Sequence, residues 1–190
     1  MNLTEYQKLA RTTAIYTENP KNKILYPVLG IISESGEVCG KIKKLIRDDE
    51  GEMTKERKSA IVKELGDCCW YLSSICSDCG IDFSLIKEMI SPSIRSLVKT
   101  FDIFRLSAYM SNNISEVANI LLKLYYDHGA EPVRLYKFRE FNRYLSIVMT
   151  CLDEMASKCD TTIEDICELN INKLLDRKQR GVLRGDGDNR

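Results

Sequence analysis

Residues 29–47 read LGIISESGEVCGKIKKLIR, and apolar side chains return along this stretch every three or four positions. That period is typical of an α-helix with one buried face and does not fit the alternation of a β-strand. The helix is expected to begin near Tyr26-Pro27 and to end near Arg47. Its apolar positions are Leu29, Ile32, Val38, Ile42 and Leu45.

The same spacing continues along most of the chain, which contains only four prolines and ten glycines. The sequence therefore predicts an all-α fold, a helical bundle. Asn2, Thr54 and either Thr161 or Thr162 are suited to cap helices, and Gly80 is suited to end one. The other helices are expected at about residues 3–16, 55–79, 85–104, 114–126, 138–158 and 162–180.

The composition limits the partners that this chain can have. Its 190 residues suit a single domain, residues 1–190, that can bury a core without disulfides. The 28 basic and 28 acidic residues cancel, so we expect neither a nucleic acid polymer nor a membrane as partner. The sequence has no export signal and no spanning stretch, which leads us to expect a cytoplasmic protein whose eight cysteines are reduced and buried.

Two pairs of acids stand at helical spacing on two consecutive predicted helices. Glu34 and Glu37 lie on the first, and Glu64 and Asp67 lie on the second. Antiparallel packing of these helices would bring the four carboxylates together, and such an open oxygen site suits Mg²⁺ shared with substrate phosphates. The alternative is two solvated pairs neutralised by nearby bases such as Lys41 and Lys63.

Each acidic pair also encloses a glycine, Gly36 in the first and Gly66 in the second. A glycine inside a helix costs about 1 kcal/mol relative to alanine. We therefore expect a helix or a ligand to approach the backbone closely at both positions.

The acidic stretches LGIISESGEV (residues 29–38) and ELGDCCWYL (residues 64–72) resemble the two halves of the signature of MazG-like nucleoside triphosphate pyrophosphohydrolases, in the phage and dCTPase-like branch. The resemblance implies a cytoplasmic hydrolase that cleaves a (deoxy)nucleoside triphosphate to the monophosphate and pyrophosphate. It implies Mg²⁺ as the cofactor, with Mn²⁺ as a substitute. The metal-binding and catalytic residues it implies are Glu34, Glu37, Glu64 and Asp67. From the chemistry of the reaction, one glutamate can serve as general base instead of metal ligand; we assign this role to Glu37, although the sequence does not separate it from Glu34.

The resemblance also extends to the last predicted helix and to one aromatic residue. It implies that Asn170 and Lys173 reach the nucleotide, that Tyr71 touches the base, and that Arg177 and Arg180 fold over phosphates. Each residue also has a plainer interpretation, because helical polar residues are mostly exposed and an aromatic in an apolar run is often core.

Residues 83–160 form an inserted helical segment without counterpart in compact members of that family. The resemblance implies a homodimer or homotetramer, and the insertion leaves this assembly open. A second hypothesis is a catalytically silent helical module that binds a nucleotide or a protein.

Overall fold

The computed structural model describes residues 1–19, 22–128 and 139–185, and within these ranges it is helical with no strand. The all-α fold class is confirmed. No helix in the described ranges combines the length and the apolar character needed to cross a bilayer. In chain order the elements are α1 (Leu3–Arg11), η1 (Ile15–Glu18), α2 (Leu25–Asp48), α3 (Lys55–Cys79), η3 (Phe83–Glu88), α4 (Pro92–Lys99), α5 (Ile103–His128), α6 (Arg139–Lys158) and α7 (Ile163–Gln179).

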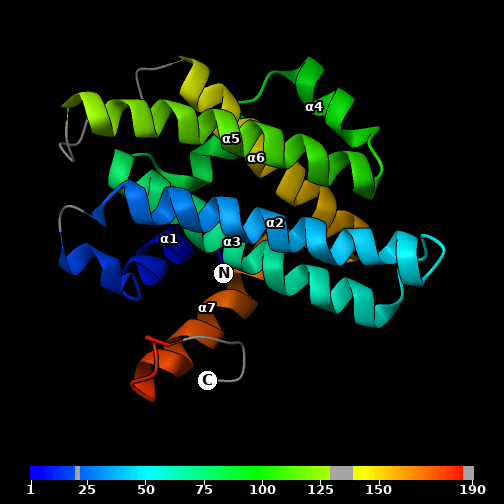
Figure 1. The fold of residues 1–190 in the computed structure, drawn as a ribbon, viewed down its shortest axis with the longest axis horizontal. Coiled ribbons are helices and arrows are strands. Elements are labelled where there is room, and N and C mark those ends of the chain that lie inside the picture. Colours follow the sequence, from blue (N-terminus) through cyan, green and yellow to red (C-terminus); the bar gives the residue numbers. More distant parts are fainter. Residues whose placement is uncertain (20–21, 129–138, 186–190) are drawn as a thin grey trace.

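The long helices α2 and α3 form an antiparallel hairpin, and α5 and α6 form a second one against it (Figure 1). Helix α2 packs on both α3 and α5, whereas α7 and α1 pack on α3 from another side. The acidic hairpin is therefore held between the inserted segment and the two ends of the chain.

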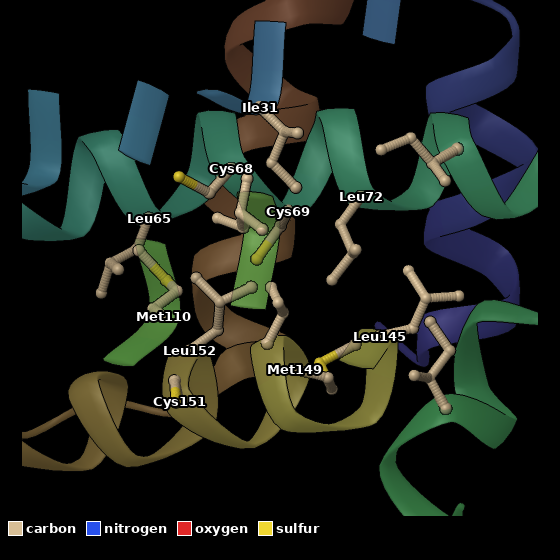
Figure 2. Close-up of a cluster of buried hydrophobic side chains, with 14 of the residues drawn as sticks. Ile31, Leu65, Cys68, Cys69, Leu72, Met110, Leu145, Met149, Cys151 and Leu152 are labelled. Carbon is tan, nitrogen blue, oxygen red and sulfur yellow. The ribbon is translucent and has the colours of Figure 1, made fainter. Parts of the chain in front are cut away.

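The interior is built from aliphatic side chains, methionines and cysteines contributed by several helices. Figure 2 shows this cluster where α2, α3, α5 and α6 meet. All eight cysteines are free thiols and all but Cys39 are buried, which confirms their expected place as small core residues. The labelled side chains of the cluster are Ile31, Leu65, Cys68, Cys69, Leu72, Met110, Leu145, Met149, Cys151 and Leu152.

The local signals for helix ends are confirmed where side chains bond to the backbone. The Asn2 side chain accepts from Glu5 N at 2.8 Å and completes a capping box. Thr54 caps α3, Thr162 caps α7, and Gly80 ends α3 in the left-handed conformation with φ 70°.

Three predicted helix boundaries are wrong. The first helix ends at Arg11 instead of Tyr16, and a short 3₁₀ turn follows it. The helix expected over residues 85–104 is broken, because Pro92 begins a new helix at the cap Ser91. The helix expected to begin at about residue 114 begins at Ile103, so residues 111–113, which were expected to precede it, lie inside α5. Phe138, the expected start of the sixth helix, lies outside the described residues.

The apolar face expected for α2 is also partly wrong. Leu29 is 62% exposed and Ile32 is 41% exposed. The buried stripe runs instead through Val28, Ile31 and Ser35 before it meets the predicted Val38, Ile42 and Leu45. Sequence spacing alone admits both stripes at this end of the helix, and packing on α3 and α5 selects one of them.

Candidate active site

Three of the four predicted acids meet where α2 and α3 pack. One carboxylate oxygen from each of Glu34, Glu37 and Glu64 lies within 4.8 Å of the others. The first two share a face because they are three residues apart on α2, and the hairpin brings Glu64 opposite them. Three carboxylates this close suit a hard divalent cation, since they repel one another without positive charge between them.

Burial and mutual repulsion make this cluster electrostatically unfavourable. Burial first, and then the charges of Asp67, Glu37 and Glu64, together raise the pKa of Glu34 to about 8 against an opposing effect of Lys173. The pKa of Glu64, which is buried, is also raised by burial, although Lys41 opposes the shift. This donor set fits a divalent cation: Glu34, Glu37 and Glu64 would hold it, and its charge would relieve the repulsion.

Asp67, the fourth predicted acid, is engaged by residues of α7. Lys173 Nζ donates to both of its carboxylate oxygens, at 2.7 and 2.8 Å, and Asn170 Nδ2 donates to Oδ1 at 2.7 Å. Lys41 Nζ likewise lies 3.0 Å from Glu64 Oε1. Lys41 therefore neutralises Glu64, as expected if the acids form solvated pairs with nearby bases. Lys173, which was expected to contact the nucleotide, is bonded to Asp67 instead.

A pocket of about 490 Å³ opens beside the acids. The four carboxylates lie in its wall, and aromatic rings make up another part of the lining. Its remaining lining residues are Thr13, Ile15, Tyr16, Tyr26, Trp70, Tyr71, Leu174, Arg177, Leu183 and Gly185.

The aromatic residues of this pocket, Tyr16, Tyr26, Trp70 and Tyr71, form one cluster. Tyr16 stacks on Tyr26 with ring centroids 4.9 Å apart, and Tyr71 meets Trp70 edge to face at 4.8 Å. Trp70 is buried and donates from Nε1 to Thr13 Oγ1 at 2.9 Å, which makes it a core residue as well as a wall of the pocket.

Tyr16 and Tyr26 are site residues that the sequence analysis did not identify. Tyr26 could have been predicted from helical spacing, because it lies on the same helix as Glu34, about two turns earlier. Tyr16 could not, because it reaches the pocket from η1 through tertiary packing.

Glycines bring backbone and site side chains together at two positions. A Cβ on Gly66 would meet Asn170 Cβ at 3.1 Å, so close approach at Gly66 is confirmed. Among the described residues, no atom outside the neighbouring backbone lies within 4 Å of a Cβ built on Gly36, so a helix contact there is wrong and approach of a ligand stays a prediction. The tightest approach is at Gly30, where a Cβ would lie 2.0 Å from Tyr71 Cε1.

The two predicted arginines are placed differently. Arg177 is buried and lines the pocket. Arg180 is exposed, pairs with Asp176 at 2.8 Å and is not among the described residues that line the pocket. The segment after α7 contributes Leu183 to the lining instead. The next residue, Arg184, pairs with Glu18 of η1 at 3.0 Å.

Fold and site together define an all-α protein with a carboxylate cluster beside an aromatic pocket. No family model matches the chain, and no solved structure matches it. The chain is similar to the Gene 37 protein of Mycobacterium phage L5, with 30% identity over 92 residues that cover 46% of this chain and 81% of the phage protein. The chain belongs to the same family as that phage protein.

Proposed function

We propose that this protein is a magnesium-dependent nucleoside triphosphate pyrophosphohydrolase of the MazG-like kind. The observation that carries the proposal is the meeting of Glu34, Glu37 and Glu64, with oxygens within 4.8 Å, in the wall of a pocket of about 490 Å³. A cation site that opens into a pocket of this size suits a small phosphorylated substrate.

The acids of the site would bind the metal ion and activate water in this reaction. Glu34, Glu37 and Glu64 would hold the ion, and Asp67 lies beside them. A bound Mg²⁺ supplies charge neutralisation at the phosphates and lowers the pKa of nearby water. Glu37, the exposed member of the cluster, is also our proposed general base for a water that attacks the α-phosphorus, a role that it would take in place of binding the ion.

The lining of the pocket supports one orientation of the nucleotide. The rings of Tyr16, Tyr26 and Tyr71 offer flat apolar surfaces on which a base can stack. On α7, Arg177 lines the pocket and Lys173 bonds to Asp67 in its wall, so both cations are available to phosphates at the acidic end. The substrate would therefore place its base among the tyrosines and its triphosphate at the carboxylates.

The test is incubation with Mg²⁺ and a panel of nucleoside triphosphates, with monophosphate, pyrophosphate, diphosphate and phosphate resolved separately. Glu64→Gln removes one metal-binding charge from the buried cluster and should abolish product. Glu56→Gln is the matched control, because Glu56 is exposed in the first turn of the same helix. Monophosphate and pyrophosphate from wild type and control alone support the proposal, and equal turnover in all three proteins contradicts it.

The second candidate is a silent module that binds a nucleotide without cleaving it. The observation in its favour is that Lys41 and Lys173 already neutralise Glu64 and Asp67. The same incubation separates the two functions, because the module would bind triphosphate and release no product.

A homodimer or homotetramer in the cytoplasm remains part of the proposal. Exposed apolar side chains on α2, Leu29 and Ile32, are compatible with subunit contact. Light scattering of the purified protein measures the assembly directly, and a monomer at all concentrations would contradict this part.

A further inference from the structure

A chain of two hydrogen bonds runs from the buried core of α1 to the acidic site. Tyr6 Oη donates to Asn170 Oδ1 at 2.9 Å, and Asn170 Nδ2 donates to Asp67 Oδ1 at 2.7 Å. Tyr6 has no exposed surface and Asn170 is buried. The chain links three helices, α1, α7 and α3.

The direction of these bonds is determined by chemistry. An ionised carboxylate only accepts hydrogen bonds, so it requires the NH₂ group of the Asn170 amide. The amide oxygen must then face Tyr6, which has to donate. Burial raises the pKa of Tyr6 well above its ordinary value, so the phenol keeps its proton.

Without the phenol, the amide would lose one of the two partners that fix its orientation, and its buried oxygen would lack this donor. A rotated Asn170 would turn its oxygen towards Asp67, and two acceptors would face each other. The Asn170 side chain also packs closely against the backbone of α3, because its Cβ lies next to Gly66. The amide therefore has one favourable orientation, which Asp67 and Tyr6 hold from its two sides.

The two oxygens of Asp67 are held unequally. Oδ1 accepts from both Asn170 and Lys173, whereas Lys173 is the described donor to Oδ2. Asn170 can thus keep Oδ1 fixed while Lys173 yields to another cation at Oδ2. A carboxylate fixed at one oxygen gives up less rotamer freedom when it binds an ion.

We propose that Tyr6 is a positioning residue for the candidate metal centre: it orients the Asn170 amide, which holds Asp67 ready to share a divalent cation with the glutamate cluster. This inference rests on the proposed metal centre, but it does not depend on which substrate is cleaved. Tyr6 itself lies outside the pocket lining and touches no reacting atom.

The variant that tests this role is Tyr6→Phe. The ring of Tyr6 packs near Phe83, with centroids 5.9 Å apart, and a phenylalanine keeps that packing while it removes the donor. Tyr109→Phe is the matched control, because Tyr109 packs on Phe101 within the inserted segment and is not among the residues that line the pocket. Asn170→Ala is the second variant, and the double variant Tyr6→Phe/Asn170→Ala completes a cycle.

Mn²⁺ is the probe, and free Mn²⁺ is measured by electron paramagnetic resonance during titration of each protein. Loss of the bond that orients the partner of a metal ligand is expected to weaken Mn²⁺ binding about tenfold in Tyr6→Phe, the lower end of the range for such partners because Tyr6 acts through Asn170. Tyr109→Phe should bind like wild type. Tyr6→Phe should add nothing in the Asn170→Ala background, because the amide through which it acts is gone.

The outcomes separate this inference from the proposed function. Equal Mn²⁺ affinity of Tyr6→Phe and wild type, or equal weakening by Tyr6→Phe in both backgrounds, would overturn the positioning role. Mn²⁺ binding that follows the expected pattern without any triphosphate cleavage would overturn the proposed function and support the positioning role. Absence of Mn²⁺ binding in the wild type would overturn both.

Discussion

Gly30 sets the position of an aromatic wall of the pocket, and Gly30→Ala is the most informative single change outside the acids. The added Cβ would lie 2.0 Å from Tyr71 Cε1 and 2.4 Å from Cδ1 and Cζ. Carbon atoms in contact sit about 3.5–4.0 Å apart, so the ring has to move by about 1.5 Å. Trp70 and Tyr26 flank this ring, with centroids 4.8 and 6.1 Å away, and oppose that movement.

Two opposing contributions determine the effect on stability. Alanine in place of glycine favours a helix by up to about 1 kcal/mol. Overpacking of this kind costs about 1–3 kcal/mol. The expected net result is a loss of about 1 kcal/mol, which corresponds to a decrease in Tm of about 2–4 °C for a chain of this size.

Thermal unfolding by circular dichroism measures this change, and Gly40→Ala is the matched control. Gly40 lies on the same helix, and among the described residues a Cβ there meets no atom within 4 Å outside the neighbouring backbone, so this variant should raise the Tm. In a Tyr71→Ala background the obstacle is removed, and Gly30→Ala should become stabilising too. A Tm increase for Gly30→Ala in the wild-type background would refute the reasoning.

Three further predictions concern charge. The pKa of Glu34 is raised to about 8, so the folded protein binds a proton there that the unfolded chain has released. The free energy of unfolding should therefore fall as pH rises from about 4.5 to about 8. A flat profile in wild type, or an unchanged slope in Glu34→Gln, contradicts this. Mg²⁺ should raise the Tm of wild type at pH 8, whereas Glu64→Gln should not respond. Arg11→Met leaves the buried Asp78 carboxylate without the cation 2.7 Å away. It should cost about 3 kcal/mol in urea unfolding, the lower end for a broken buried pair because the Arg11 side chain is 33% exposed, and no loss would contradict this.

Much of the helical architecture follows from local signals in the sequence. Asn2, Thr54 and Thr162 cap helices where they were expected, because a cap needs only its own side chain and the next turn of backbone. The boundaries that were wrong depend on longer-range contacts or on a proline. Residues 111–113 continue α5, since that helix is supported along its length by α2 and α6.

The acidic cluster was accessible from sequence because its geometry is also local. Spacing of three residues puts Glu34 and Glu37 on one face, and a short connection folds α3 back beside them. The partners of Asp67 were not accessible in the same way. Lys173 and Asn170 reach it only because α7 packs on α3, and no spacing rule relates positions so far apart in the chain.

The measurement that tests the central claim most directly is hydrolysis of a triphosphate in ¹⁸O-labelled water with Mg²⁺, followed by mass spectrometry of both products. Attack at the α-phosphorus predicts one labelled oxygen in the monophosphate and none in the pyrophosphate. Label in the pyrophosphate, release of single phosphate, or no cleavage of any triphosphate in the panel would contradict the account.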